Sequence, residues 1–312
     1  MEKRKIFVIG HKNPDTDSVC SAIAYAQLKN EIDTENEYIP LRAGQTNEET
    51  QYVLKQFGVN APQYVMDVKS QVKDIEIRKV DGVDRNISIK AAWKLMRDIG
   101  VVTLPITRDN KLEGLITIAD IGTSYMDVHD STTLSTARTV CKNIVETLDG
   151  ALIIGDEEHV FDRGKVLVAA ANPDLMESYI RMGDIVILGN RYESQLCAIE
   201  MQAGCIVVCE GAPVSMTIKK LAVENHCTII STPHDTFTAS RLINQSVPIS
   251  FFMRTEGLIT FSTEAYTDEV RQVMAKKRHR DFPIHDEQGN YIGMISRRNQ
   301  IGRAHVRTPV TT

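Results

Sequence analysis

The chain has 312 residues, more than one ordinary hydrophobic core organises, so we expect two or more domains. Apolar residues make up 42% and charged residues 25% of the sequence, which excludes collagen-like and largely disordered proteins. No apolar run approaches the roughly 18 residues of a membrane span. The formal net charge of −5 argues against general binding to nucleic acid or to an anionic membrane, because such binding needs an excess of Lys and Arg. We therefore expect a soluble, folded protein with neither kind of partner.

The cysteines and the N-terminus both indicate a cytoplasmic protein. The six cysteines include no Cys-x-x-Cys pair and lie mostly in apolar runs, which is typical of buried thiols in a reducing compartment. The first residues run directly into a short apolar segment without the features of a secretory signal.

The first 65 residues have the pattern of an α/β domain. The apolar run 6–9 predicts a strand, and periodic apolar residues from Ser18 onward predict a helix. Residues 45–58 predict a second helix, and a domain boundary is expected near Met66. One face of the first helix would carry Val19, Ile23, Ala26 and Leu28.

An internal repeat is the most informative large-scale feature. Pro105-Ile106 and Pro283-Ile284 follow a Met at the same distance, and each pair precedes a polar turn and an apolar run that opens at Gly114 or Gly293. Each copy predicts a unit of helix, two strands and helix. Since a unit of about 55 residues is too small to bury a good core alone, we expect the two copies to pack on each other.

Between the two copies, short β-branched runs alternate with helical stretches. This alternation predicts βαβ units with a parallel sheet, and hence a third domain inserted between the copies. The expected strands are 166–171, 184–188, 205–209 and 228–231.

The loop directly after the first expected strand contains several potential metal-ligating side chains. His11, Asp15 and Asp17 place one imidazole and two carboxylates within seven residues, at the end of a strand where open α/β sheets bind ligands. Two carboxylates so close repel each other unless a cation lies between them, and mixed nitrogen and oxygen ligands suit Mn²⁺, Co²⁺ or Mg²⁺. The alternative is a structural turn, in which the aspartates form an Asx turn and Ser18 caps the helix.

The octapeptide His11-Lys12-Asn13-Pro14-Asp15-Thr16-Asp17-Ser18 closely resembles the first metal-binding motif of family II inorganic pyrophosphatases, members of the DHH phosphoesterase superfamily. The repeat resembles a pair of CBS domains, and the segment between its copies resembles a DRTGG domain. The resemblance implies an α/β fold in which a partial DHH-type parallel-sheet domain precedes a CBS pair of βαββα units, split by an inserted α/β DRTGG domain. The implied segments are 1–65 (DHH), 66–126 and 248–301 (CBS), 127–247 (DRTGG) and 302–312 (a non-native tail).

The resemblance implies a two-metal pyrophosphatase site. His11 and Asp15 would bind one Mn²⁺ or Co²⁺ ion and Asp17 the other, to activate water for attack on pyrophosphate, while Mg²⁺ accompanies the substrate. The family completes the cluster with further aspartates and an Asp-His-His motif, which does not occur in this sequence. We therefore expect an N-terminal fragment of a pyrophosphatase, truncated before that motif and inactive alone. The alternatives are a non-catalytic adenine-nucleotide-binding regulatory module and, disfavoured by the acidic charge balance, another DHH phosphoesterase.

The CBS pair implies a regulatory nucleotide site between its copies. Gly114, Thr117 and Asp120 form the Gly-x-x-Thr-x-x-Asp stretch whose acid holds ribose hydroxyls in such pairs, since a carboxylate can accept from both. Ser296 and Asn299 occupy the matching places in the second copy and carry no charge. The implied ligand is AMP, ADP or a diadenosine polyphosphate.

Basic residues flank this expected cleft. Arg280, in the basic run 276–280, and Arg298 would contact nucleotide phosphates, because Arg suits bidentate contacts. For the two lysines of the run, a solvated helix C-terminus is an equally good interpretation. Phe282 would stack on adenine, or else be a core residue, which is more usual for an apolar residue before Pro-Ile.

The remaining expectations concern partners. Pyrophosphate would be the substrate, adenine nucleotides the regulators, and a homodimer would form through the CBS and DRTGG domains. Asn190 stands where DRTGG domains carry an acid before Arg, and Cys209-Glu210-Gly211 replaces the usual Thr-Gly-Gly. We therefore expect the inserted domain to be a spacer and dimer contact rather than a ligand site.

Overall fold

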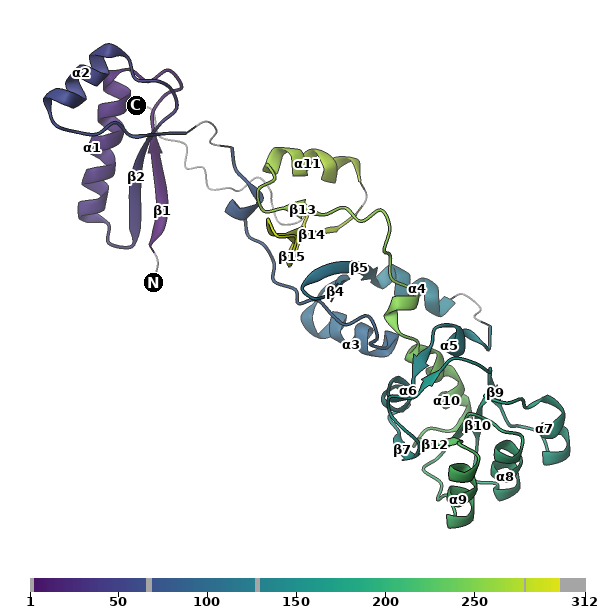
Figure 1. The fold of residues 1–312 in the computed structure, drawn as a ribbon. Coiled ribbons are helices and arrows are strands. Elements are labelled where there is room, and N and C mark those ends of the chain that lie inside the picture. Colours follow the sequence, from purple (N-terminus) through teal and green to yellow (C-terminus); the bar gives the residue numbers. More distant parts are fainter. Residues whose placement is uncertain (1–2, 66–68, 127–129, 278, 298–312) are drawn as a thin grey trace. The chain divides into compact units, whose positions relative to one another are not determined.

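A computed structural model describes residues 3–65, 69–126, 130–277 and 279–297 (Figure 1). The chain divides into two compact units, one of Met1–Gln71 with Tyr266–Asp268 and one of Val72–Ala265 with Glu269–Thr312. No helix in the described ranges is long and apolar enough to cross a lipid bilayer. The expected boundary at Met66 and the tail 302–312 fall outside the described residues.

The first unit contains a three-stranded parallel sheet and two helices. Strand β2 is central, between β1 and β3. The expected strand and both helices are confirmed, and β2 and β3 are additional. Along α1, Val19 and Ala26 are buried as predicted, but Leu28 is 53% exposed, so its predicted place on the buried face is wrong. The elements are β1 (Arg4–Ile9), α1 (Thr16–Ile32), β2 (Asn36–Arg42), α2 (Glu48–Gln56) and β3 (Gln63–Tyr64).

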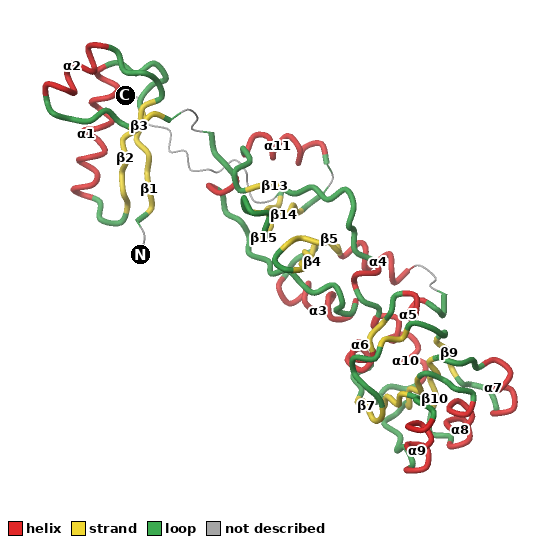
Figure 2. The backbone as a smooth tube through the Cα atoms, in the orientation of Figure 1, coloured by secondary structure: helices red, strands yellow, loops and turns green. Residues whose placement is uncertain are grey.

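The second unit contains both copies of the repeat, and each copy has an antiparallel strand pair next to a helix (Figure 2). Val83 pairs in parallel with Ile106 in the first copy, and Phe261 pairs in parallel with Ile284 at the equivalent place in the second. The first copy comprises α3 (Ile89–Ile99), β4 (Thr103–Arg108), β5 (Lys111–Thr117) and α4 (Ile118–Met126). The second comprises β13 (Phe261–Ser262), α11 (Thr267–Lys276), β14 (Asp281–His285) and β15 (Tyr291–Ser296).

The two copies exchange short segments. Arg254, ahead of β13 in the second copy, pairs with Leu115 of β5 in the first, and Arg78, ahead of α3 in the first copy, pairs with Met294 of β15 in the second. Further contacts include the Thr103 hydroxyl, which donates to Asp281 at 2.9 Å. The predicted packing of the copies on each other is therefore confirmed. A short 3₁₀ turn, η1 (Val72–Asp74), leads into the first copy, and η3 (Ile249–Phe251) leads toward the second.

The inserted domain is built on a five-stranded sheet in the order β7-β12-β11-β10-β9. The four predicted strands are parallel, and β7 is antiparallel at the edge beside β12. The sheet strands are β7 (Ala151–Ile154), β9 (Val166–Val168), β10 (Ile185–Leu188), β11 (Cys205–Val208) and β12 (Thr228–Ser231). The helices are α5 (Thr133–Thr136), α6 (Cys141–Thr147), α7 (Pro173–Tyr179), α8 (Tyr192–Glu200), α9 (Met216–Glu224), α10 (Thr236–Leu242) and η2 (Ile243–Ser246), and β6 (Thr139–Val140) pairs with β8 (Val160–Phe161).

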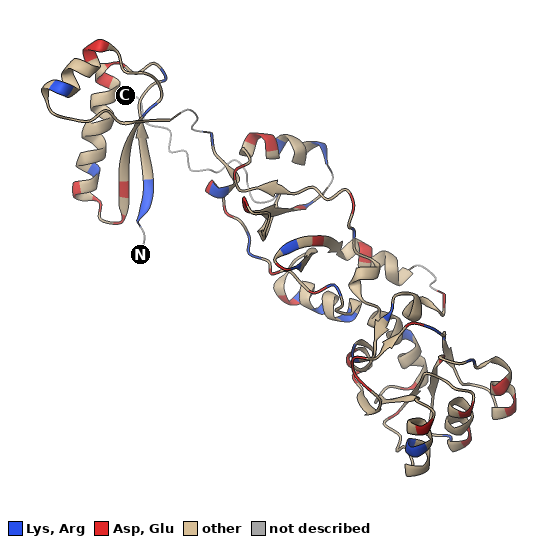
Figure 3. Cartoon of the chain, viewed as in Figure 1, with Lys and Arg blue, Asp and Glu red and all other residues tan. Residues whose placement is uncertain are grey.

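The two faces of this sheet contribute to different cores. Val186 and Ile206 belong to one core with residues of α7, α8 and α9. Ile187 and Val207 point the other way, into a core shared with α6, α10 and the first copy of the repeat. The alternation of side chains along each strand therefore packs the inserted domain against the repeat on one face of its sheet. Lys and Arg are interspersed with Asp and Glu over this unit (Figure 3).

Candidate functional site

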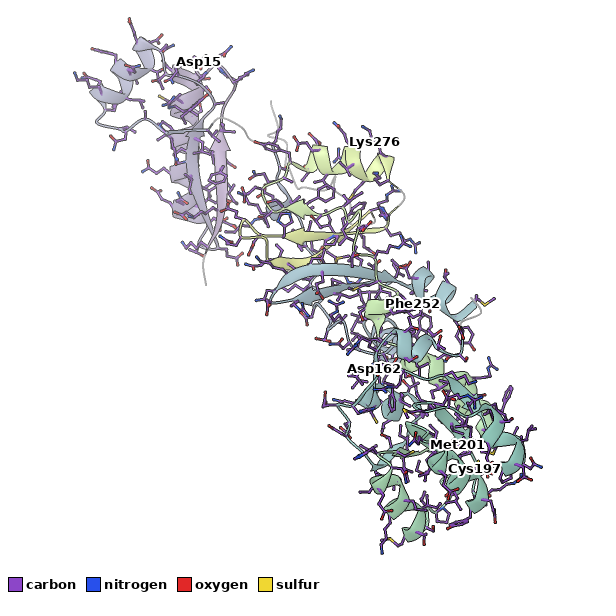
Figure 4. The ribbon with its side chains drawn as sticks, turned by 45° about the vertical axis from the view of Figure 1, so that its right-hand side comes forward. Asp15, Asp162, Cys197, Met201, Phe252 and Lys276 are labelled. Atoms are coloured by element: carbon purple, nitrogen blue, oxygen red, sulfur yellow. The ribbon has the colours of Figure 1, made fainter. Side chains whose placement is uncertain are left out.

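The proposed metal-binding loop connects β1 to α1. Asp15, labelled in Figure 4, is the N-cap of α1, and its Oδ1 accepts a hydrogen bond from the backbone N–H of Ser18 at 2.9 Å. The hydroxyl of Ser18 accepts from the backbone N–H of His11 at 3.2 Å. The structural turn predicted as the alternative for this loop is therefore partly correct. An aspartate forms the turn, but the residue that caps the helix is Asp15 and not Ser18.

Close packing fixes the path of the loop. A β-carbon added at Gly10 would lie 1.9 Å from Oγ of Ser18, and one added at Gly44 would lie 2.6 Å from Cδ of Pro14. Both glycines are thus needed for the backbone to approach. As a result, the segment after β2 lies against the loop that follows β1, at the C-terminal edge of the parallel strands.

Two of the three predicted metal ligands face each other. Nε2 of His11 lies 3.3 Å from Oδ1 of Asp15, and both side chains are more than half exposed. Neighbouring ligands of one octahedral ion at about 2.1 Å lie roughly 3 Å apart, so this pair fits a shared divalent cation. Oδ1 of Asp17 instead accepts from the hydroxyl of Ser21 at 3.3 Å. Within the described ranges, no group of three or more His, Cys, Asp or Glu side chains is arranged to hold a metal ion.

The predicted ribose-binding residues form a capping box at the start of α4. Oδ2 of Asp120 accepts from the backbone N–H of Thr117 at 2.9 Å and from its hydroxyl at 2.7 Å. The hydroxyl of Thr117 in turn accepts from the backbone N–H of Asp120 at 3.2 Å. These reciprocal bonds begin the helix and hold the carboxylate in one orientation. The Thr-x-x-Asp pattern therefore has a structural role, and its role in binding ribose stays a prediction.

Arg254 pairs with the other oxygen of this carboxylate. Its Nε and Nη2 lie 3.0 Å and 2.6 Å from Oδ1 of Asp120. Burial alone would raise the pKa of Asp120, but the hydrogen bonds from Thr117 and Arg254 outweigh it and hold the pKa below its ordinary value. Asp120 is therefore a carboxylate at neutral pH.

Arg254 was not among the predicted site residues. It lies 134 residues from Asp120 in the sequence and reaches it only because the two CBS copies exchange segments. A weak signal was present, since an arginine precedes a glycine near the start of each copy, at Arg78 with Gly82 and at Arg254 with Gly257.

The other predicted nucleotide contacts have different outcomes. Arg280 is exposed, as a phosphate contact requires. Phe282 is 1% exposed and packs in the core of the second copy, with its ring 5.6 Å from that of Phe261, so the stacking role is wrong and the core interpretation is correct. Ser296 ends β15 and is half-buried. Arg298 and Asn299 lie outside the described residues.

Comparison with protein families identifies all three kinds of domain. Residues 5–151 match the N-terminal domain of the DHH family, residues 143–246 match the DRTGG domain, and residues 250–299 match the CBS domain.

Two curated relatives align with nearly the whole chain. It is 40% identical over 297 residues to the cobalt-dependent inorganic pyrophosphatase of Clostridium perfringens, which covers 95% of this chain and 54% of that protein. It is 30% identical over 293 residues to the probable manganese-dependent inorganic pyrophosphatase of Thermotoga maritima, covering 94% and 53%. The chain thus spans about half the length of these relatives.

A solved structure matches the second unit's domains. It is the crystal structure of the CBS and DRTGG domains of the regulatory region of Clostridium perfringens pyrophosphatase, complexed with its activator diadenosine tetraphosphate. The TM-score is 0.70 at 37% identity, and the match covers 73% of this chain and 100% of that one. Together with the domain matches, these similarities show that the chain belongs to the family II inorganic pyrophosphatases that carry a CBS pair and a DRTGG domain.

Proposed function

We propose that this chain carries the first metal-ligand set of a metal-dependent inorganic pyrophosphatase, which hydrolyses diphosphate to two phosphates, together with the region through which adenine nucleotides regulate it. The main support is the match to a complete regulatory region that was crystallised with diadenosine tetraphosphate. The capping box that orients Asp120 in the first CBS copy supports the nucleotide part independently.

His11, Asp15 and Asp17 would hold Mn²⁺ or Co²⁺ at the end of β1. When bound, such ions lower the pKa of a bound water and neutralise the diphosphate, which Mg²⁺ accompanies. The chain's own contribution is positional: the Asp15 cap fixes one carboxylate toward His11 at 3.3 Å. Asp17 accepts one hydrogen bond, from the Ser21 hydroxyl at Oδ1, which leaves acceptor positions on its carboxylate for a second ion.

In the regulatory part, Asp120 would accept the ribose hydroxyls of AMP, ADP or a diadenosine polyphosphate. Thr117 holds that carboxylate in place, and Arg280 would meet a phosphate. Ser296, Arg298 and Asn299 would form the second half-site.

The alternative function is a regulatory module without catalysis. It is favoured by the absence, among the described side chains, of any group of three potential metal ligands. Because this ligand set is expected to be inactive alone, binding of Mn²⁺ or Co²⁺ to the wild-type chain, lost in His11→Ala, separates the two functions.

The chain would act as a cytoplasmic homodimer. Tyr125 and Met126, at the end of α4, are 53% and 80% exposed, and Trp93 on α3 is 39% exposed. Large exposed apolar side chains close together are typical of an interface. Sedimentation equilibrium of the wild-type chain and of a Met126→Asp variant tests this, and a monomeric wild-type protein would contradict it.

Thermal unfolding with nucleotides tests the regulatory function. A ligand that binds only the folded state stabilises it by about 2.7 kcal/mol at a hundred times Kd. We expect AMP and diadenosine tetraphosphate to raise Tm, and guanine and pyrimidine nucleotides to have little effect. Equal shifts with all bases, or none with millimolar AMP, would refute the adenine site.

A further inference from the structure

The ribose acceptor proposed above has no free hydrogen-bonding capacity. A carboxylate offers about four acceptor positions. Thr117 takes two of them at Oδ2 of Asp120, and Arg254 takes two at Oδ1. A ribose brings two further donors, its 2′ and 3′ hydroxyls. They can bind Asp120 only if bonds from Thr117 or Arg254 are released.

Arg254 is the partner that can leave. The Thr117 bonds belong to the capping box, and breaking them would expose the first turn of α4. The guanidinium of Arg254 is 53% exposed and would recover bonds to water on release, whereas Asp120 is only 14% exposed. Release of Arg254 therefore exchanges its bonds to Asp120 for bonds to water, while the ribose hydroxyls replace it at the carboxylate.

The backbone keeps Arg254 near the site after its side chain is released. Its N–H donates to the carbonyl of Leu115 at 2.9 Å, and its carbonyl accepts from the N–H of Leu115 at 3.0 Å. Gly114 permits this approach, since a β-carbon there would lie 2.9 Å from the carbonyl oxygen of Arg254. A released guanidinium therefore stays tethered beside Asp120.

We propose that Arg254 determines the specificity of this site for phosphorylated adenine nucleosides. Without ligand, Arg254 occupies the ribose acceptor. When ribose binds, Arg254 is displaced and becomes a cation available to phosphate. Binding of a nucleoside breaks the ion pair between Arg254 and Asp120 and forms no new one. The phosphate of a nucleotide gives the displaced guanidinium a new anionic partner. The inference rests on the proposed nucleotide site.

Replacing Arg254 separates the two effects. In Arg254→Met, which removes the donors and keeps an aliphatic stem, adenosine should bind up to about fivefold more tightly because it no longer competes with an ion pair. AMP should bind several-fold more weakly, so that the preference for AMP over adenosine falls by about tenfold or more. Calorimetric titration measures both constants. Arg254→Gln provides a second variant if Arg254→Met does not fold.

Arg85→Met is the matched control. Nη1 of Arg85 pairs with Oε1 of Glu113, a residue of β5, at 3.0 Å. This ion pair involves neither Asp120 nor Arg254. Losing this ion pair should leave both nucleotide affinities unchanged. An equal change in Arg85→Met and Arg254→Met would show a general effect of lost ion pairs and overturn the proposal.

The dependence of adenosine affinity on ionic strength distinguishes this role of Arg254 from a purely structural one. Adenosine is neutral, yet its affinity for the wild-type protein should rise between roughly 0.05 and 0.5 M ionic strength, because screening weakens the competing pair. In Arg254→Met the affinity for adenosine should not change with ionic strength. In an Asp120→Asn background, replacing Arg254 should not change the affinity for adenosine. If the wild-type protein binds AMP but Arg254→Met keeps the wild-type AMP to adenosine ratio, the proposal fails and the nucleotide site stands. If the wild-type protein binds no adenine nucleotide, both fail.

Discussion

Gly293 lies directly against the backbone of Arg78, so that a β-carbon at Gly293 would lie 2.7 Å from the carbonyl oxygen of Arg78. The bridge between Arg78 and Met294 brings the segment ahead of the first CBS copy onto the sheet of the second. Gly114 has the same relationship to Arg254 in the other copy. Each glycine therefore allows the close backbone contact through which a segment of one CBS copy pairs with the sheet of the other.

Gly293→Ala should destabilise the second unit, because the added β-carbon would lie 2.7 Å from both the carbonyl oxygen of Arg78 and Cγ2 of Ile77, and because Gly293 has a φ of +154°, which L residues rarely adopt. We expect a loss of about 1 to 3 kcal/mol in the free energy of unfolding, measured with urea. Gly122→Ala is the matched control. No atom lies within 4 Å of a β-carbon at Gly122, which is inside α4, so that change should be neutral or stabilising. Equal effects of the two substitutions would contradict the role of Gly293.

The order of elements could largely be predicted from periodicity, but one central strand could not. Residues Asn36–Arg42 form β2 although Pro40 stands within them, and proline normally argues against a central strand. The structure tolerates Pro40 because β3 pairs only with Leu41 and Arg42, so β2 has a single partner strand at Pro40. The length of a neighbouring strand is not visible in local sequence.

Arg280→Ala should reduce AMP affinity more than adenosine affinity. Arg280 is exposed beside the start of β14, and the proposed contact is to phosphate, which adenosine lacks. We expect the AMP effect to shrink at high ionic strength, where charge pairs are screened. Calorimetry at two salt concentrations measures this. A loss of adenosine affinity equal to that of AMP would show that Arg280 does not act through phosphate.

Asp149 should make stability depend on pH at the junction of the first CBS copy with the inserted domain. A hydrogen bond from Lys90 at 2.9 Å lowers the pKa of Asp149, burial opposes this, and a contact with His234 at 3.0 Å lowers it further. Because the pKa is depressed on folding, the stabilisation is present above the unfolded pKa of about 3.9 and is lost as pH falls through the folded value.

We therefore expect Asp149→Asn to lower the urea midpoint at neutral pH and to approach the wild-type midpoint as the pH falls through the lowered pKa of Asp149 in the folded protein. Lys142→Gln is a suitable control, since its ion pair with Glu146 spans 4.0 Å on the exposed side of one helix. A difference between Asp149→Asn and wild type that is constant across the acid range would contradict the assignment.

A protein of this sequence should show negligible pyrophosphatase activity with Mn²⁺, Co²⁺ or Mg²⁺. His11 and Asp15 can share one ion, while Asp17 is hydrogen-bonded to Ser21, and three ligands leave two ions and the substrate's far phosphate under-coordinated. Phosphate release at micromolar protein measures this. Turnover of about one per second that is lost in His11→Ala would show that these residues suffice.

The candidate site was only partly predictable because its parts come from distant segments. His11 and Asp15 were found because three potential metal ligands lie within one short loop, and Thr117 and Asp120 were found from the resemblance to CBS domains. Arg254 was missed because its place depends on the exchange between the two copies. The role of Phe282 could not be settled from the sequence, because an aromatic residue at this position can stack on a ligand or pack in the core.

The most direct test of the central claim is calorimetric titration of AMP into the wild-type chain and into Asp120→Asn. Thr117 still caps α4, and the amide oxygen of asparagine can still accept from the backbone N–H of Thr117, so the substitution chiefly removes the charged acceptor of the ribose hydroxyls together with its ion pair to Arg254. We predict saturable AMP binding to the wild-type protein, weakened by about 1.5 to 3 kcal/mol in Asp120→Asn. Identical binding of AMP to the two proteins, or no binding to either at millimolar AMP, would contradict an adenine-nucleotide site in the CBS pair.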